Sequence, residues 1–214
     1  MPFFIAFEGM SFFLSNLKIV MDINAIQEII REKYPEKLLS HSLGVEYMAR
    51  RLAAAYGVDE EKAAVAALLH DYGKIYSRQD QLQIAIDHQI AEEILLQEPV
   101  LLHGPVGSWL LQHELGIDDQ EILDAVRLHT TGSDCMALMS AIIYLADYIE
   151  PGRKTKGVPK LRELAFQDLQ QTLLEAVDST IRYTLEKQGI LHPDSVLFRN
   201  KLLSLLKKKE SGVA

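Results

Sequence analysis

Apolar residues recur every three or four positions along most of the chain, which is the spacing of one face of an α-helix. The first clear example is the stripe of Ile23, Ile26, Ile29 and Ile30, which follows Asp22, a residue type that commonly caps helices. No stretch alternates between apolar and polar residues as a half-buried strand does, and no repeat or low-complexity linker interrupts the pattern. The pattern therefore predicts an all-α fold, a helical bundle.

Prolines, glycines and capping residues divide this pattern into separate helices. Pro35 suits the first turn of a second helix, and Gly57 suits its end. Asp59 begins a third, strongly apolar helix that ends at His70 and Asp71. The later helices are expected over about 84–97, from His103 onward, from Asp118 or Asp119 to about 129, and over about 136–149, 161–187 and 194–209.

Length and charge narrow the class of protein. The chain of 214 residues is long enough for one domain with a substantial core. Its formal net charge of −8 argues against a nucleic-acid partner, which requires a basic surface, but leaves room for a small phosphorylated ligand. Cys135 is the only cysteine, which excludes an internal disulfide and a thiolate metal cluster and fits a cytoplasmic location.

The ends of the chain differ from its centre. Residues 1–20 are rich in phenylalanine, but polar residues interrupt them, so they resemble neither a signal peptide nor a membrane span. We expect them to be an extension that the fold does not require, or the result of assigning the start codon too early. Residues 21–209 are expected to form a single domain, and residues 210–214 a short tail.

The stretch from Ala66 to Lys74 carries the first candidate chemistry, because an apolar helix runs directly into adjacent His70 and Asp71. Neutral imidazole and ionised carboxylate together suit a divalent first-row metal such as Fe, Mn, Co or Zn. The two oxygens of Asp71 could also bridge two ions. An isolated His-Asp pair is more often a surface feature of a helix end, so the hypothesis depends on further ligands elsewhere.

Further histidines and aspartates lie inside or at the ends of apolar helices. Asp147 is the most telling, because it interrupts the apolar run 142–149 and a buried carboxylate needs a cation. His88 and His113 lie in polar surroundings and are expected to be solvated. The residues expected to converge are His41, His70, Asp71, His103, His129 and Asp147.

This order of residues resembles the HD-domain superfamily of metal-dependent phosphohydrolases, and most closely the YqeK-type hydrolases, which cleave diadenosine tetraphosphate symmetrically into two ADP molecules. The resemblance covers about residues 21–200, and Gly73 stands where the family is expected to have alanine. The segments that carry the resemblance are 41–46 (HSLGVE), 69–74 (LHDYGK), 102–107 (LHGPVG), 125–132 (AVRLHTTG), 144–153 (YLADYIEPGR) and 189–193 (GILHP).

The resemblance implies an HD-domain bundle and a role for each matching residue. His41, His70, Asp71 and Asp147 would hold one ion, most simply iron, while His103 and His129 would either hold a second ion or contact phosphate. Asp71 and Lys74 are the expected catalytic residues. Lys74 and Arg153 are also expected to make charge-assisted contacts to the polyphosphate. The remaining expected contacts are Thr130 to the nucleotide, Ile190 and His192 to the nucleoside, and Ser42 and Glu46 to the metal ligands.

Several alternatives stay open at this stage. Another HD phosphohydrolase would act on nucleoside monophosphates, deoxynucleoside triphosphates or cyclic dinucleotides. A di-iron HD oxygenase would consume oxygen, and a non-catalytic nucleotide sensor would bind ADP without turnover. The sequence leaves open the metal, the number of ions, the preference for adenine or guanine, and whether the chain forms a homodimer. The expected partner is a small nucleotide, with no nucleic acid and no membrane span.

Overall fold

A computed structural model describes residues 22–211, so the Phe-rich segment and the last residues of the expected tail lie outside the described part of the chain. The described residues form eleven α-helices and two short 3-10 helices and contain no strand, which confirms the predicted all-α fold. None of the helices in this part is long and apolar enough to cross a membrane.

The first three helices follow the predicted caps. In α1 (Ile23–Lys33) and α3 (Glu60–Leu69), the side chains of Asp22 and Asp59 accept hydrogen bonds from backbone N–H groups of the first turn. Pro35 occupies the cap position of α2 (Glu36–Tyr56) instead of its first turn, and Gly57 ends that helix with a φ of +69°. A short 3-10 helix, η1 (Tyr72–Ile75), follows α3 directly after His70 and Asp71.

Two of the predicted segments are wrong, because each one is divided in the structure. The expected helix over 84–97 is instead α4 (Arg78–Asp87) and α5 (Glu93–Gln97), separated where Gln89 adopts a φ of +52°. The Ser77 hydroxyl accepts from the Asp80 N–H and begins α4 inside the stretch interpreted as a polar loop. The expected helix over 161–187 is α9 (Val158–Leu164) and α10 (Leu169–Glu186), because Asp168 caps a new helix.

The remaining elements agree with the pattern within a few residues. The short helix η2 (Pro99–Leu101) leads into α6 (His103–Glu114), and Asp119 caps α7 (Gln120–Leu128). The most apolar helix is α8 (Leu138–Ile149), which is buried over most of its length. The described chain ends with α11 (Pro193–Ser211).

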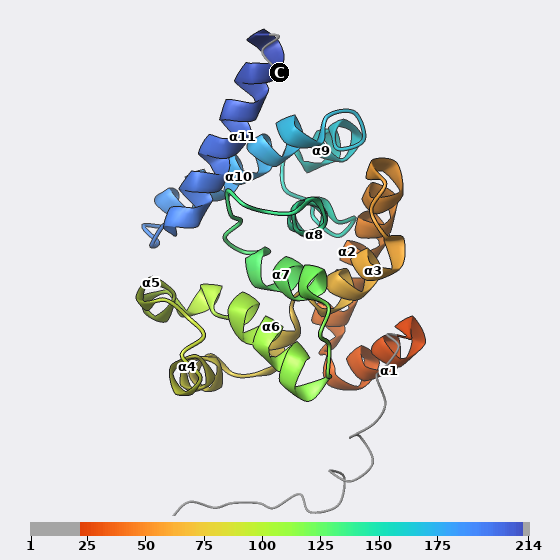
Figure 1. The fold of residues 1–214 in the computed structure, drawn as a ribbon, viewed down its shortest axis with the longest axis vertical. Helices are drawn as coiled ribbons and strands as arrows, with labels where there is room; N and C mark the ends of the chain where they lie inside the picture. Colours follow the sequence, from red (N-terminus) through yellow and green to blue (C-terminus); the bar gives the residue numbers. More distant parts are fainter. Residues whose placement is uncertain (1–21, 212–214) are drawn as a thin grey trace, which may run out of the picture.

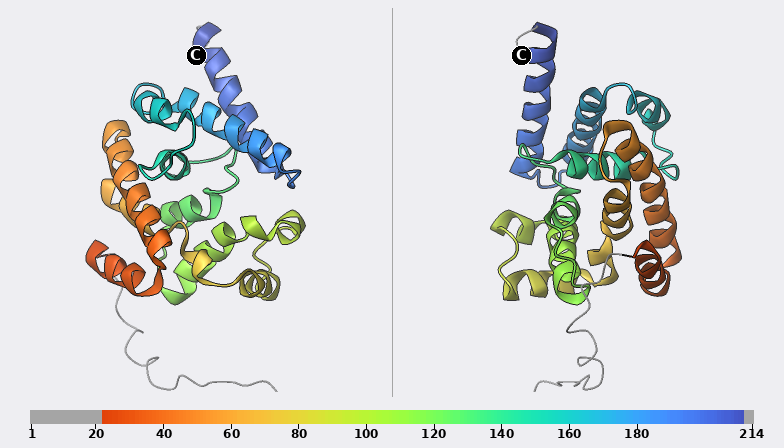
Figure 2. Two further views of the ribbon diagram at one scale, coloured as in Figure 1. Left: turned by 180° about the vertical axis from the view of Figure 1, so that it is seen from behind. Right: turned by 45° about the vertical axis from the view of Figure 1, so that its right-hand side comes forward.

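The packing surrounds α8 with the other long helices. Helix α2 packs against α3 and α8, α7 packs against α6 and α8, and α10 pairs with α11. The pair α10 and α11 lies on the opposite side of α8 from α3, and α11 projects beyond the rest of the bundle (Figures 1 and 2). The ends of α3 and α7 and the start of α6 therefore meet beside the second turn of α2 and the last turn of α8.

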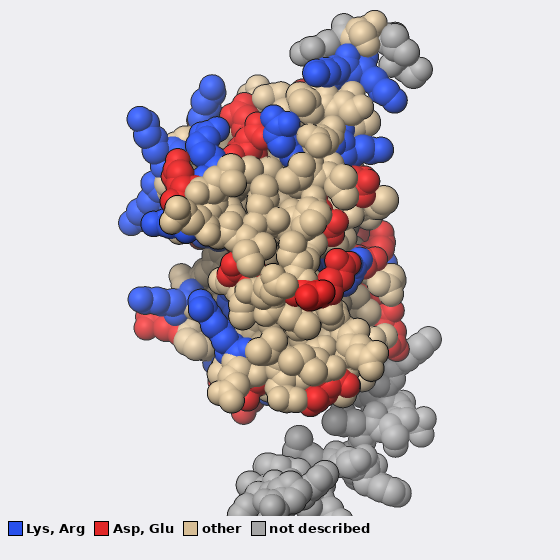
Figure 3. Space-filling view, turned by 90° about the vertical axis from the view of Figure 1, so that its left-hand side faces the viewer, with Lys and Arg blue, Asp and Glu red and all other residues tan. Residues whose placement is uncertain are grey.

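Charged side chains are distributed unevenly over one face of the molecule. Seen from the left-hand side of Figure 1, most of the face is neutral, and Lys and Arg side chains gather at one edge (Figure 3).

Candidate metal centre and adjoining pocket

Asp71 lies where the predicted residues meet, and each of its two carboxylate oxygens faces a different pair of histidines. Its Oδ2 is 3.8 Å from His41 Nε2 and 3.4 Å from His70 Nε2. Its Oδ1 is 3.2 Å from His103 Nε2 and 3.4 Å from His129 Nε2. The carboxylate is 1% exposed, so these imidazoles surround it in place of water. The predicted convergence of these five residues is therefore present in the structure.

Asp147 joins the centre from α8. Its Oδ1 is 3.1 Å from His41 Nε2 and 2.7 Å from the Nη2 of Arg153. The Asp147 side chain is 22% exposed, in contrast to the buried Asp71, because it faces a pocket. Asp147 thus lies beside the group formed by His41, His70 and Asp71, at the boundary between the buried centre and solvent.

Three of the four histidines are held by their own helix ends. The Nδ1 atoms of His70, His103 and His129 lie 2.7–2.8 Å from the carbonyl oxygens of the residues three positions earlier, Ala67, Val100 and Val126. Carbonyls in the last turn of a helix have no partner within the helix, so they are available to accept these bonds. Each imidazole is therefore fixed by the backbone that carries it.

His41 is held differently, because it lies inside α2. Its Nδ1 is 3.3 Å from Oε1 of Glu150, a buried residue at the end of α8. A carbonyl or a carboxylate can only accept a hydrogen bond, so Nδ1 must carry the proton in all four histidines. In the neutral rings, every Nε2 is consequently a lone pair facing Asp71.

This arrangement of lone pairs fits a metal ion. His103 Nε2 and His129 Nε2 are 3.0 Å apart, and neutral rings with protonated Nδ1 atoms would place two acceptors against each other. His70 Nε2 and Asp71 Oδ1 are buried without a hydrogen-bond partner in the described structure. The ligating atoms of two trios, His41-His70-Asp71 and Asp71-His103-His129, each lie within 4.8 Å of one another. A cation between such atoms would relieve the repulsion.

The electrostatics of the centre favour charged acids. Burial alone would raise the pKa of Asp71, but the nearby imidazoles of His70, His103 and His129 hold it well below its usual range. Burial also opposes ionisation of Asp147, yet the neighbouring imidazoles of His41 and His70 and the Arg153 guanidinium hold its pKa well below the ordinary value. Both acids therefore remain carboxylates at neutral pH.

The histidines respond to those acids according to their position. Burial lowers the pKa of His129 to about 4, although the neighbouring Asp71 carboxylate opposes this shift. Burial also opposes protonation of His70, but the Asp71 carboxylate, with a smaller contribution from Asp147, raises the pKa of His70. The same negative field that favours a proton on His70 favours a metal cation at that position.

The two predicted phosphate-binding cations contact the acids of the centre. Lys74 Nζ donates to Asp71 Oδ2 at 2.7 Å, and its side chain is 45% exposed. Arg153 donates to both the carboxylate and the backbone carbonyl of Asp147. Both cations thus stand at the rim of the centre, each paired with a carboxylate.

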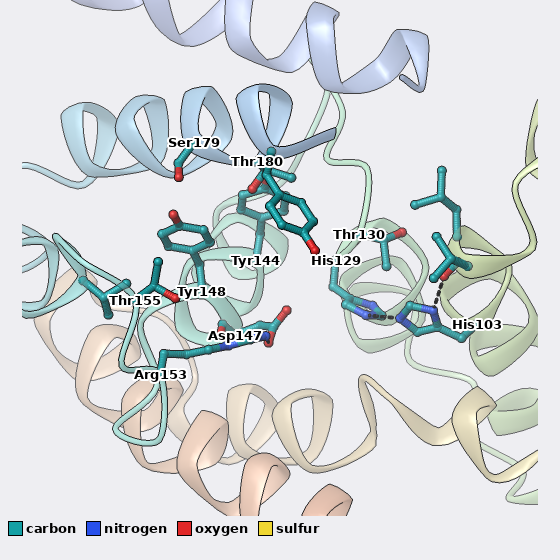
Figure 4. Close-up of a pocket in the computed structure, with 14 residues that line it drawn as sticks. His103, His129, Thr130, Tyr144, Asp147, Tyr148, Arg153, Thr155, Ser179 and Thr180 are labelled. Carbon is teal, nitrogen blue, oxygen red and sulfur yellow. Dashed lines mark hydrogen bonds and ion pairs between the residues drawn. The ribbon is translucent and has the colours of Figure 1, made fainter. Parts of the chain in front are cut away.

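A pocket of about 370 Å³ opens beside the centre between α8 and α10 (Figure 4). His103, His129, Asp147 and Arg153 form its polar end, and Thr130 lines it from the segment after α7. Sequence reasoning did not single out several residues on its other walls, because their side chains carry no distinctive chemistry. These residues are Val100, Leu101, Tyr144, Tyr148, Thr155, Val158, Ser179, Thr180 and Tyr183.

The predicted C-terminal loop lies next to this pocket and not in its walls. His192 is buried and lines a smaller cavity of about 90 Å³, which shares Thr130 with the larger pocket. The hydroxyl of Ser195 donates to the Thr131 carbonyl and ties the start of α11 to the segment after α7. Ile190 is 38% exposed and lines neither cavity.

Three further expectations can be compared with the structure. Glu46 pairs with Arg50 at 2.9 Å, and the Ser42 hydroxyl has no hydrogen-bond partner in the described structure, so neither contacts the metal-ligand group. Glu150 contacts His41 instead. His88 and His113 are exposed, as expected, and they stack on opposite faces of Trp109.

The expected replacement of the family's alanine by Gly73 is more than a small change in this structure. A Cβ at this position would collide with the backbone carbonyl of His103 and lie 3.1 Å from the Gly107 nitrogen. The bare Cα allows η1 to approach α6 closely, and this approach brings Asp71 to His103.

Comparison with protein families agrees with this geometry. The HD domain family matches residues 38–152, which include all six of the converging residues from His41 to Asp147. The helical fold and the two His-Asp groups are thus those of an HD-domain protein, a class of metal-dependent phosphohydrolases.

Relatives give a narrower assignment. The chain is 38% identical over 175 residues to a symmetrical bis(5'-nucleosyl)-tetraphosphatase of Bacillus subtilis, with 82% of this chain and 94% of the relative covered. The corresponding protein of Staphylococcus aureus is 36% identical over 169 residues, covering 78% and 87%. This chain belongs to the HD-domain family, in the group of the symmetrical bis(5'-nucleosyl)-tetraphosphatases.

A solved structure supports the fold. The crystal structure of a predicted HD superfamily hydrolase involved in NAD metabolism from Clostridium acetobutylicum has a TM-score of 0.81 and 40% sequence identity. The match covers 86% of this chain and 97% of that chain. The family resemblance expected from the motif order is therefore confirmed.

Proposed function

We propose that this protein hydrolyses dinucleoside tetraphosphates symmetrically, converting diadenosine tetraphosphate into two ADP molecules. The observation that carries the proposal is the gathering of four imidazoles around the Asp71 carboxylate, with Asp147 next to His41. This group lies beside a pocket that Arg153 lines. The names of the relatives from Bacillus subtilis and Staphylococcus aureus support this substrate.

The metal ligands of this proposal are His41, His70, Asp71 and Asp147 for one ion. The donors are nitrogen and oxygen without sulfur, which suits Fe, Mn, Co or Zn, and we propose iron on the family resemblance. When bound, such an ion lowers the pKa of a coordinated water from 15.7 to about 7 and neutralises charge on phosphoryl oxygens. The protein's part is to keep Asp71 and Asp147 ionised and to aim the Nε2 atoms inward.

We assign a second ion to Asp71, His103 and His129. The support is the 3.0 Å separation of the two Nε2 atoms, both of them lone pairs when the Nδ1 protons bond backbone carbonyls. The rival role, a direct contact of His103 and His129 with phosphate, requires Nε2 to carry a proton. One metal equivalent per chain in active protein would favour that rival role, and two would favour the second ion.

Lys74 and Arg153 would bind the polyphosphate. Both are cations that contact carboxylates of the centre, and Arg153 also lines the pocket, so phosphate oxygens bound at the centre would lie close to both charges. Lys74 is proposed as a catalytic residue together with Asp71, because a cation there stabilises charge on the phosphoryl group. The leaving group is a nucleoside diphosphate that is stable as an anion, so a dedicated general acid is not required.

Thr130, Ile190 and His192 are the proposed nucleotide contacts outside the centre. Thr130 and His192 share a small cavity, and Thr130 Oγ1 and His192 Nε2 both lack a hydrogen-bond partner in the described structure. These atoms could bond a ribose or a base. Ile190, which is more exposed, would contact the nucleoside only through its apolar side chain.

The test is anaerobic purification with metal quantification, followed by product identification from a panel of dinucleoside polyphosphates. We expect bound first-row metal and two nucleoside diphosphates from each tetraphosphate. Free phosphate or a nucleoside as the product would indicate another HD phosphohydrolase, and oxygen consumption would indicate an oxygenase. ADP binding without turnover would indicate a sensor. The cytoplasmic location and a homodimer stay predictions.

A further inference from the structure

We propose that Glu150 is a positioning residue that holds His41 for metal binding. The proposal rests on the assignment of His41 as a metal ligand in the proposed function. Glu150 is 5% exposed, and its Oε1 is 3.3 Å from His41 Nδ1. Its role is to accept a hydrogen bond from the Nδ1–H group. This bond keeps the proton on Nδ1, so that the lone pair of Nε2 points toward Asp71 and Asp147.

The position of His41 within its helix explains why such a residue is needed. In a helix interior, each carbonyl accepts from the N–H four residues later and is not free to bind a side chain. His41 is the sixth residue of α2, whereas His70, His103 and His129 lie at helix ends and use free carbonyls. An acceptor for His41 must therefore come from a different element, and Glu150 supplies it.

Two glycines make room for the Glu150 carboxylate. A Cβ at Gly44 would lie 2.6 Å from Oε2, and a Cβ at Gly152 would lie 2.9 Å from both carboxylate oxygens. The Gly152 N–H also donates to Oε2. One oxygen is thus bound by the backbone of its own segment while the other faces His41, so the carboxylate has a defined orientation.

Arg162 fixes the backbone that carries Glu150. Its guanidinium donates to the carbonyls of Ile149 and Glu150, both at 2.6 Å, and to the carbonyl of Arg153 at 2.7 Å. These bonds hold the turn after α8 to α9. Arg162 thus holds the backbone of Glu150 from α9, while the Glu150 carboxylate contacts His41.

A carboxylate behind a metal-binding imidazole fixes its ring and makes Nε2 a stronger ligand, and loss of such a partner typically lowers metal affinity about 10–100-fold. Glu150→Ala is therefore expected to weaken metal binding by about this factor. Glu150→Gln should weaken it by less, because the amide oxygen still accepts a hydrogen bond from Nδ1–H but carries no charge. The matched control is Glu46→Gln, since Glu46 is an acid on α2, the helix of His41, that pairs with Arg50 away from the centre.

The experiment is a Co²⁺ titration of the metal-free full chain, followed by the visible absorption of the bound ion, with thermal unfolding of each metal-free variant in parallel. The proposal predicts graded affinities, with wild type and Glu46→Gln tightest, Glu150→Gln intermediate and Glu150→Ala weakest, and an altered Co²⁺ spectrum in the two Glu150 variants. Because metal-free Glu150→Gln keeps the hydrogen bond, its unfolding midpoint should stay close to that of wild type.

Unchanged Co²⁺ affinity and spectrum in Glu150→Gln and Glu150→Ala would overturn the proposal. If Glu150→Ala does not fold, Glu150→Gln decides, and weakened binding that merely follows a fallen unfolding midpoint would also overturn it. The readout needs no substrate. A protein that binds Co²⁺ in the predicted order but leaves dinucleoside tetraphosphates intact would sustain the role of Glu150 and refute the proposed function.

Discussion

His41 and the three other histidines reach the same carboxylate by two different means. His70, His103 and His129 are oriented by carbonyls of the turn that carries them, within three residues along the chain. His41 is oriented by Glu150, which is 109 residues away. The first means requires only that a helix ends at the right residue, and the second requires that two helices pack correctly.

The difference separates local from tertiary control of the centre. The trio of Asp71, His103 and His129 depends on where α6 begins and α7 ends, together with the close approach at Gly73. The side containing His41 and Asp147 depends on how α2 lies against α8. Substitutions that affect one side, both sides or neither can therefore test the comparison.

The largest effect is expected at Asp71, which both sides share. Asp71→Ala removes the carboxylate whose two oxygens face all four imidazoles, so turnover of diadenosine tetraphosphate should be abolished and most of the metal lost. Metal analysis and product chromatography measure the two losses. Asp124→Ala removes a partly exposed acid paired with Arg127, and this control should retain both properties. Full turnover in Asp71→Ala would refute the assignment of the centre.

Lys74→Ala should lower activity without emptying the centre. A hydrogen bond to a charged group contributes about 1.5–3 kcal/mol, so kcat/KM should fall roughly 10–100-fold through a higher KM or a lower kcat. Steady-state kinetics with metal analysis of the same sample distinguish the effects, and Lys160→Ala, an exposed lysine of α9, serves as the control. Loss of metal would instead show that Lys74 supports Asp71 and does not act on substrate.

Gly73→Ala tests the side of the centre formed by α6 and α7. The added Cβ would collide with the His103 carbonyl, and overpacking of this kind costs about 1–3 kcal/mol of unfolding free energy. Urea denaturation measures the loss. Gly189→Ala should change stability by less than about 0.5 kcal/mol, because its Cβ would make an ordinary contact of 3.4 Å with Thr184. Equal stability of Gly73→Ala and wild type would mean that η1 is free to move.

The smallest effect is expected from Asp119, at the end of α7 remote from His129. Its side chain accepts from the N–H groups of Glu121 and Ile122 and lies 2.7 Å from Lys62 Nζ. Asp119→Ala should cost about 1 kcal/mol of unfolding free energy, the usual value of a lost cap, with metal content unchanged. Loss of metal in this variant would show that distant strain in α7 reaches the centre.

The same variant has a predicted pH dependence. Slight burial opposes ionisation of Asp119, but the Lys62 ammonium lowers its pKa below the usual value. A lowered pKa in the folded state stabilises the protein above the unfolded pKa of about 3.9, and this contribution disappears as the pH falls through the folded value. The stability difference between wild type and Asp119→Ala should therefore be full at neutral pH and shrink only below about pH 4.

The sequence predicted the part of the site that helix ends determine. His70 and His129 end strongly patterned helices and His103 precedes Pro105, so their place at helix termini could be inferred from spacing alone. Asp147 could be inferred because a carboxylate in an apolar run requires a cation. The contacts of the three histidines with Asp71, and that of Asp147 with His41, could be seen only in the structure.

The parts that could not be predicted depend on packing between distant segments. Glu150 lies in a turn sequence that gives no sign of a partner on α2, and Glu46, which is on α2 itself, seemed the more natural choice. Thr180 and Tyr183 line the pocket only because a new helix, α10, starts after the cap residue Asp168 and packs against α8. The break at Gln89 was missed because a non-glycine residue with positive φ leaves no signature in composition.

The last turn of α8 has a further electrostatic consequence. Asp147 and Glu150 lie at the negative end of the helix macrodipole, where an acid is disfavoured by about 0.3–1 kcal/mol. Arg153 and Arg162, which follow in the chain, bring two positive charges to this helix terminus and bind its carbonyls. Lysine could replace the charge of Arg162 but not its fork of donors, so this end of α8 should tolerate arginine far better than lysine.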